Sequence, residues 1–73
     1  MNRLDEADLK EFGDNLKKVR EEKKLTQADV ANISKVNANY YACIERGEVN
    51  PSYKKLRQIV KALNIKSSDI LPF

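Results

Sequence analysis

The apolar residues of this chain recur every three or four positions, and this spacing limits the fold more than any other feature of the sequence. A period of about 3.6 residues places such residues on one face of an α-helix, whereas the alternation typical of strands is scarce. Two stripes are long enough to cover a full helix face. They are formed by Leu9, Phe12, Leu16 and Val19, and by Leu56, Ile59, Val60 and Leu63. The pattern therefore predicts an all-α protein.

Helix-capping residues divide the chain into five predicted helices joined by short turns. The predicted ranges are 6–23, 27–33, 37–46, 53–63 and a one-turn helix at 67–71. Each range begins at or just after a residue whose short polar side chain can accept hydrogen bonds from free backbone N–H groups. These predicted N-caps are Asp5, Thr26, Asn37, Ser52 and Ser67. Gly47 and Asn64 predict the ends of the third and fourth helices, and Pro72 stops the fifth.

The length of the chain, 73 residues, predicts one small domain that spans 1–73. A domain of this size buries only about 60% of the surface of its unfolded chain, so a catalytic cleft would consume core that the fold needs. The sequence has no histidine and one cysteine, Cys43, which excludes a disulfide or a multi-cysteine zinc site within one chain. We therefore expect no enzyme, no metal, no other cofactor and no small-molecule ligand.

The charge of the chain is unevenly distributed. Residues 1–15 carry two bases and five acids, whereas the remainder carries twelve bases and six acids. A positive body suits a polyanionic partner such as nucleic acid, although a solvated basic surface would have the same composition. No apolar run reaches the roughly 18 residues of a membrane span, and no signal peptide is visible. We expect a cytoplasmic protein without a membrane partner.

Residues 27–46 contain two short predicted helices joined by a three-residue turn, the geometry of a helix-turn-helix. The spacing alone does not single out that motif, because any helical bundle contains such pairs. Three segments in order carry a resemblance: 25–31 (LTQADVA), 44–47 (IERG), and 50–52 (NPS) followed by the stripe at 56–63. With these segments, residues 12–71 resemble the phage-repressor and Cro type of helix-turn-helix protein, the XRE family. The resemblance implies a compact five-helix, lambda-repressor-like DNA-binding domain.

The turn of the motif departs from the usual family pattern. Ser34 and Lys35 stand where the family generally has an apolar residue and then glycine or asparagine. Residues 34–46, with Tyr40 and the IER run at 44–46, are similar to the controller proteins of restriction-modification systems. A second departure follows the motif, where Glu48 and Val49 replace commonly basic residues.

The exposed side of the third predicted helix is the candidate base-reading surface, because the N-terminal end of a recognition helix reaches base edges in the major groove. The resemblance assigns Ala38, Asn39 and Cys43 to base-reading positions, and Tyr40 could donate to a base or a phosphate. Asn39 can pair bidentately with adenine, and Ala38 can contact a thymine methyl group. Each residue also has a simpler interpretation: Asn39 as a solvated residue, and Cys43 as a small filler.

Phosphate contacts are expected on both sides of this helix, because free N–H groups at helix starts favour anions. The candidates are Gln27, Lys35, Asn37, Arg46, Asn50, Ser52, Tyr53, Lys54 and Lys55. Lys54 and Lys55 oppose the dipole at the start of the fourth helix, and a bound phosphate would offset that penalty. The alternative is a plain solvated surface.

Two further assignments concern structure and assembly. The resemblance implies that Arg20 and Glu45 form a partly buried ion pair between the first and third helices, which is a structural role. One recognition helix reads only a few base pairs, so we expect a homodimer built on the segment 64–73. The expected interface residues are Ile65, Ile70, Leu71 and Phe73, and the alternative is that they close the monomer core.

Together these features predict a sequence-specific, double-stranded-DNA-binding transcriptional regulator. It would bind a palindromic operator through the major groove as a homodimer, as an autoregulatory controller of a restriction-modification system. A phage-type repressor and an antitoxin-like protein-interaction module are the alternatives, and RNA polymerase is a further candidate partner. Salt separates the DNA and protein hypotheses, because phosphate contacts weaken steeply with ionic strength.

Overall fold

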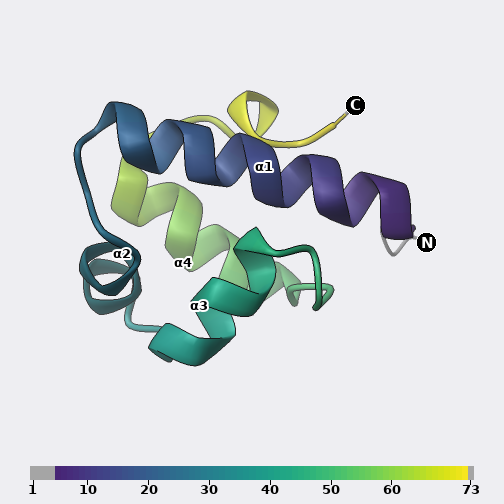
Figure 1. Cartoon of the computed structure of the whole chain (residues 1–73). Coiled ribbons are helices and arrows are strands. Elements are labelled where there is room, and N and C mark those ends of the chain that lie inside the picture. The colour runs from purple at the N-terminus through teal and green to yellow at the C-terminus, as the bar shows by residue number, and fades with distance from the viewer. Residues whose placement is uncertain (1–4, 73) are drawn as a thin grey trace.

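A computed structural model describes residues 5–72 of the chain as an all-α fold. Its helices are α1 (Glu6–Glu22), α2 (Gln27–Ser34), α3 (Ala38–Glu45) and α4 (Tyr53–Leu63), followed by the 3₁₀ turn η1 (Ser67–Asp69). α1 runs along one side of the molecule, and α2 and α3 fold beneath it (Figure 1). The predicted helix class is confirmed, and the four long segments lie within one or two residues of their predicted ranges.

The prediction of five helices is wrong at the C-terminal end. Within residues 5–72 there are four α-helices, and the fifth element is a three-residue 3₁₀ turn. Ser67 is the first residue of this turn and not its cap: Lys66 holds the N-cap position, and its backbone N–H donates to the carboxylate of Asp69 at 2.9 Å. Pro72 opposes an extension into an α-helix, because it lacks an N–H and disfavours helical geometry at the residue before it.

Short polar side chains start the α-helices as predicted. Asp5 accepts from the N–H of Asp8 at 2.8 Å, and Ser52 accepts from the N–H of Lys55 at 3.2 Å. Thr26 and Asp29 exchange reciprocal side-chain to backbone bonds of 3.0 and 2.8 Å, a capping box. These bonds satisfy N–H groups that a helix start leaves free, so the helix boundaries follow from local chemistry.

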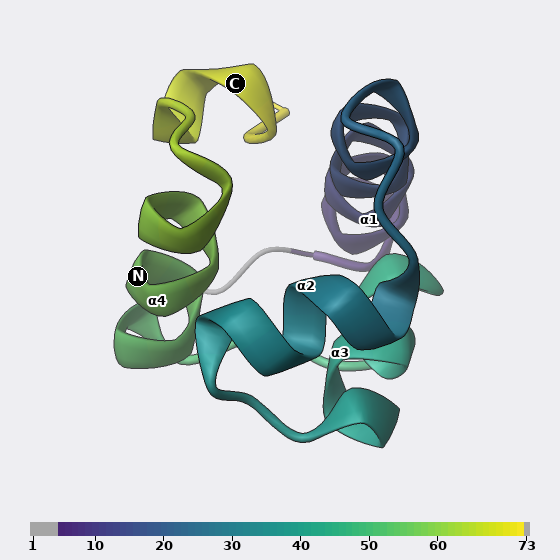
Figure 2. The same cartoon turned by 90° about the vertical axis from the view of Figure 1, so that its left-hand side faces the viewer.

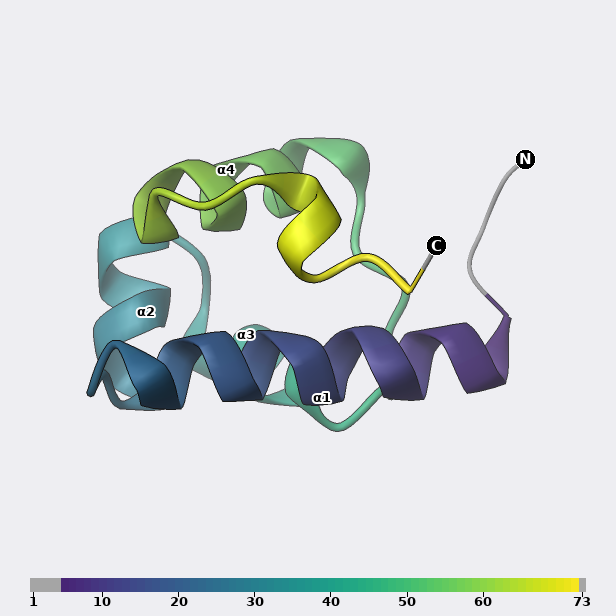
Figure 3. The ribbon, with the colours of Figure 1, turned by 90° about the horizontal axis from the view of Figure 1, so that it is seen from above.

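The core lies where all four helices converge. Its largest fully buried side chains are Tyr41, Phe12, Leu16, Ile44, Ile59, Ile70 and Val30. Ile70 reaches the core because the C-terminal segment returns between α4 and α1 (Figure 3). The amide of Asn15 on α1 holds that segment by donating to the Ile70 carbonyl oxygen at 3.1 Å.

Gly13 explains how closely α1 approaches the end of α3. A Cβ atom on this residue would overlap the carbonyl oxygen of Glu45 and lie 2.7 Å from that of Ile44. Both neighbours are backbone atoms of α3, which cannot move aside cheaply. The glycine costs about 1 kcal/mol of helix propensity, and in return the backbones of α1 and α3 touch. This contact sets the position of α3 in the fold.

Candidate nucleic-acid interface

The outward surface of α2, the turn and α3 forms the candidate interface (Figure 2). α3 buries Tyr41 and Ile44 on its inner side and exposes Ala38 and Asn39 in its first turn. Tyr40 is half-buried and packs against the core. Of the four predicted base readers, the structure therefore exposes two fully and leaves Tyr40 and Cys43 partly accessible.

The first turn of α3 is held by the side chain of Asn37. Its Oδ1 accepts from the backbone N–H groups of Asn39 and Tyr40 at 2.8 and 3.1 Å. The cap consumes two of the N–H groups that a phosphate could otherwise use at this helix start. The side-chain amide hydrogens of Asn37 remain for a phosphate, and Asn39 lies in a turn that this cap fixes.

A buried polar network fixes the far end of α3. The carboxylate of Glu45 accepts from Arg20 Nε at 2.6 Å, Arg20 Nη2 at 3.1 Å, the Tyr41 hydroxyl at 2.6 Å and Gln27 Nε2 at 3.0 Å. Arg20 and Glu45 thus form an ion pair, and their side chains are only 10% and 2% exposed. The donors on Arg20 and Gln27 tie α3 to α1 and α2.

The titration of these groups agrees with a structural role. Burial alone would raise the pKa of Glu45, but the hydrogen bonds from Arg20, Tyr41 and Gln27 outweigh it and hold that pKa below its ordinary value. The same carboxylate raises the pKa of Arg20. Burial and the bond to Glu45 raise the pKa of Tyr41. Glu45 therefore stays ionised at neutral pH and serves as an acceptor rather than a proton donor.

Gln27, predicted to contact phosphate, also belongs to this network. It is the first residue of α2 and is half-buried, and one of its amide hydrogens is used by Glu45. Its second amide hydrogen remains for an anion at the start of α2. Sequence reasoning missed the bond to Glu45, as it missed the hydroxyl of Tyr41, because both depend on how the helices pack.

Arg46, just after α3, already holds a carboxylate. Its Nε and Nη2 lie 3.0 Å from the two carboxylate oxygens of Glu48, and Nη2 also lies 3.3 Å from Cys43 Sγ. The hydrogen bond to Glu48 raises the pKa of Arg46, and the same bond lowers that of Glu48. Glu48 therefore partly neutralises Arg46, which was predicted to contact phosphate. The spacing of two residues between Arg46 and Glu48 could have suggested this pair.

The exposed side of α4 is uniformly basic. The helix carries four cations and no acid, with Lys54 exposed and Lys55 half-buried. Tyr53 leaves 78% of its surface accessible. A shallow hollow of about 320 Å³ on this side is lined by Tyr53, Lys54, Arg57, Gln58 and Lys61. The spacing of Arg57 and Lys61 from Lys54, three and seven residues, was a signal for this basic face that sequence reasoning left unused.

The remaining phosphate candidates lie in turns. Lys35 is exposed between α2 and α3 in the left-handed region, with φ 61° and ψ 40°. Asn50 is half-buried in the loop before α4, and Ser52 is exposed at the start of that helix. Lys35 and Asn37 therefore lie in the turn of the helix-turn-helix, while Asn50 and Ser52 lie just before α4.

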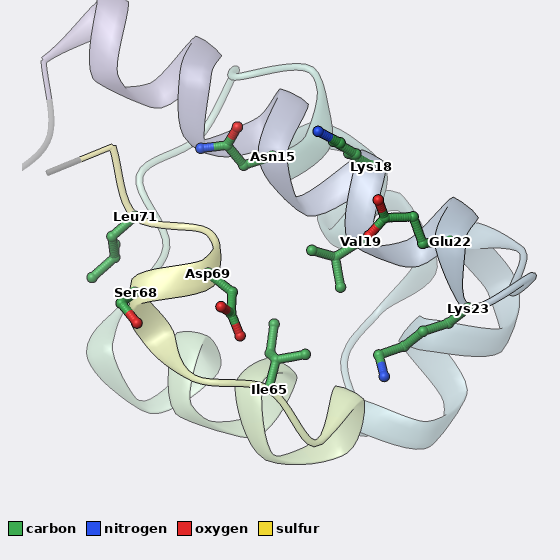
Figure 4. Close-up of a pocket in the computed structure, with 9 residues that line it drawn as sticks. All are labelled: Asn15, Lys18, Val19, Glu22, Lys23, Ile65, Ser68, Asp69 and Leu71. Atoms are coloured by element: carbon green, nitrogen blue, oxygen red, sulfur yellow. The ribbon is translucent and has the colours of Figure 1, made fainter.

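The residues expected at a dimer interface divide into three groups. Ile70 is fully buried in the monomer core and has no surface to offer a second chain. Ile65 and Leu71 are half-buried and line, with Val19, a hollow of about 510 Å³ beside α1 (Figure 4). Phe73 lies outside the described residues.

Between residues 5 and 72, the His, Cys, Asp and Glu side chains form no group of three or more that could hold a metal ion. In the same part of the chain, no helix combines the length and apolar character needed to cross a bilayer.

Comparison with known proteins identifies the motif. The helix-turn-helix family model matches residues 16–70, which contain α2, α3 and most of the core. The chain belongs to the XRE-type helix-turn-helix family. Members of this family are DNA-binding transcriptional regulators and not enzymes, so the helix-turn-helix of this chain is a DNA-binding motif.

Phage repressors and restriction-modification controllers are among the proteins that this chain is similar to. The immunity repressor protein of Bacillus phage phi105 is 39% identical over 59 residues, which are 81% of this chain and 41% of that protein. The restriction-modification controller protein C.AhdI from Aeromonas hydrophila has a TM-score of 0.86 at 32% identity, over 89% of this chain and 98% of that chain. The controller protein C.Esp1396I has a TM-score of 0.74 at 36% identity, over 80% of this chain and 74% of that chain. The chain spans about half or less of the length of the curated relatives it matches.

Proposed function

We propose that this helix-turn-helix regulator recognises a specific palindromic operator as a homodimer, with the first turn of α3 in the major groove. The observation that carries the proposal is the fixed and uncharged start of α3. Asn37 locks that turn, and Ala38 and Asn39 are exposed on it. A turn held in this way can present Asn39 to an adenine edge and Ala38 to a thymine methyl group. Tyr40 and Cys43 flank these contacts at the rim of the core.

Groups on either side of α3 supply the phosphate contacts. Gln27 offers its second amide hydrogen at the start of α2, and Ser52, Tyr53, Lys54 and Lys55 begin α4. Lys35, Asn37 and Asn50 lie in the connecting turns. Such contacts set the register of the protein on the duplex, while the base contacts select the sequence.

Dimerisation would use the hollow beside α1. Ile65 faces Val19, Leu71 lies at the other edge of the hollow, and charged side chains lie around them (Figure 4). Two copies related by a two-fold axis would cover these surfaces and place two α3 helices about 34 Å apart, one turn of DNA. Control would then follow from protein concentration, which suits an autoregulator acting in the cytoplasm with its DNA.

The similarity to C.AhdI over nearly the whole of that chain supports a restriction-modification controller. The identity with the phage phi105 immunity repressor supports a phage-type repressor as the second candidate. Both functions use the same DNA interface, so one binding experiment tests the part they share.

Selection from a pool of randomised duplexes, followed by titration of the selected site, tests this function. A palindromic site should emerge, and its affinity should fall steeply between about 50 and 200 mM salt. Binding without sequence preference at any ionic strength would overturn the proposal. A salt-independent interaction with a protein, and none with DNA, would favour the antitoxin-like alternative.

Sedimentation tests the dimer separately. The wild-type chain should be dimeric at micromolar concentration or on its operator, and Leu71→Asp should remain monomeric. Ser67→Asp, an exposed position on η1 that does not line the hollow, is the matched control. Circular dichroism shows whether each variant is folded. A wild-type chain that stays monomeric with and without DNA would contradict the dimer.

A further inference from the structure

We propose that Arg46 reads a guanine base in the operator and that Glu48 is the positioning residue that holds its guanidinium for that contact. The inference rests on the proposed function and replaces the phosphate role that the sequence suggested for Arg46. Three observations support it: the place of Arg46 relative to the exposed stripe of α3, the geometry of its ion pair, and its reduced net charge.

Arg46 continues the base-reading stripe of α3. Asn39, Cys43 and Arg46 are separated by four and then three residues, which places them on one side of a helix. The structure agrees with this alignment, because Arg46 Nη2 lies 3.3 Å from Cys43 Sγ one turn earlier. At a rise of about 1.5 Å per residue, Arg46 lies roughly 10 Å along the helix from Asn39. A long arginine side chain can span the remaining distance to the groove floor.

The ion pair leaves the base-reading edge of the guanidinium available. Glu48 occupies the side edge, formed by Nε and Nη2, with two contacts of 3.0 Å. The end edge, formed by Nη1 and the second hydrogen of Nη2, can donate to O6 and N7 of guanine, the commonest specific contact in the major groove. The sulfur of Cys43 is a weak acceptor on Nη2, so a guanine atom can displace it.

Neutralisation by Glu48 favours a base over a phosphate. A phosphate contact depends on net positive charge, and a carboxylate beside the guanidinium both reduces that charge and repels the phosphate. Guanine O6 and N7 are uncharged acceptors, for which orientation matters more than charge. The side chains of Arg46 and Glu48 are 55% and 53% exposed, so the pair is formed on the surface and faces solvent.

Affinity measured on the selected operator and on its single-base variants tests the assignment. Arg46→Ala should reduce discrimination at one G·C position about 5- to 150-fold, the range of a good bidentate contact, and leave the other positions unchanged. Arg57→Ala removes an exposed arginine from α4 and is the matched control. It should weaken all sequences equally. Equal loss on every sequence with Arg46→Ala, together with a salt slope lower by about one, would overturn the proposal in favour of a phosphate contact.

Glu48→Gln tests the positioning role. It should lower discrimination at the same G·C position while strengthening binding to all duplexes, because Arg46 loses its orientation and regains its charge. Glu11→Gln, an exposed acid on α1, is the control for charge alone. Stronger binding with unchanged discrimination would show that Glu48 only competes with DNA and would overturn its role. If the wild-type protein prefers no site at all, the proposed function fails instead, and the two failures are distinct.

Discussion

α3 and α4 both turn one side outward, but the fold holds them by different means. α3 combines buried apolar packing, through Tyr41 and Ile44, with directional bonds in which Glu45 accepts from Arg20, Tyr41 and Gln27. α4 is anchored mainly by apolar area, through Ile59, Leu63 and their neighbours, with one side-chain bond from Gln58 to the carbonyl oxygen of Ser34 at 2.9 Å. The outward sides differ as well, because the helical residues of α3 expose no charge while α4 exposes a row of cations.

The contrast matches the work expected of each helix. Base reading needs a side chain placed to within a fraction of an ångström, and hydrogen bonds restrict angle as well as distance. Attraction to phosphates is less directional, so a helix held by non-directional burial is sufficient for it. Under the proposed function, the buried network of α3 would serve recognition by holding that helix in place.

The largest expected effect comes from removing the anchor of α3. Glu45→Gln leaves the guanidinium of Arg20 buried without its counter-ion, and breaking a buried pair in this way costs about 3–5 kcal/mol of unfolding free energy. Urea unfolding followed by circular dichroism measures the loss. The control is Glu11→Gln, which changes an exposed acid on α1 and should leave the unfolding free energy nearly unchanged. A loss below about 1 kcal/mol would mean that α3 is held by apolar packing, as α4 is.

A second expected effect is the acid dependence of that loss. The pKa of Glu45 is lower in the folded chain than its ordinary value near 4.3, so its contribution is complete above that value and disappears as pH falls through the folded pKa. The stability gap between wild type and Glu45→Gln should therefore narrow in acid, in the same urea assay.

Ile59→Ala provides the contrast from α4. Ile59 is fully buried and is not titratable. The substitution should therefore lower the unfolding free energy by about 2–5 kcal/mol at every pH. A gap for Glu45→Gln that is equally constant down to strongly acidic pH would contradict the ionised state of the network.

A smaller effect should separate the outward sides of the two helices. Asn39→Ala is expected to cost about 1–3 kcal/mol at one operator position and to relax the base preference there, because the bidentate contact is lost. Lys54→Ala on α4 should instead weaken all duplexes alike and reduce the salt slope by about one. Fluorescence titrations on operator variants at several salt concentrations distinguish the two patterns. A uniform loss for Asn39→Ala would remove it from the base-reading set.

Features governed by neighbouring residues could be predicted from the sequence. The caps at Asp5, Thr26 and Ser52 and the apolar stripes of α1 and α4 use contacts within one or two turns, which the sequence displays directly. The C-terminal turn could not be predicted in the same way. Ile70 packs in a core built by residues distant in the sequence, and a short apolar run does not reveal that.

The candidate site shows the same division. The outward position of Asn39 and the cap by Asn37 followed from helix geometry, whereas the donors that Tyr41 and Gln27 give to Glu45 depend on the packing of three helices. Gly13 was visible as an anomaly in a helix, but its cause is the backbone of α3 lying against it. Side-chain partners chosen by packing are therefore the part that sequence reasoning missed.

The smallest effect concerns the turn that joins α2 to α3. Lys35 has φ 61° and ψ 40°, a left-handed conformation that costs an L-residue about 1–2 kcal/mol and that glycine adopts freely. Glycine also increases the conformational entropy of the unfolded chain, which offsets part of this gain. Lys35→Gly should therefore raise the unfolding free energy by only about 0.5–1 kcal/mol. Lys23→Gly is the matched control, because its φ of −87° carries no such strain, and it should not stabilise the fold. Base discrimination should survive Lys35→Gly, since the anchor at Glu45 and the cap at Asn37 still hold α3. A stable variant that loses discrimination would show instead that the turn, and not the buried network, orients the reading helix.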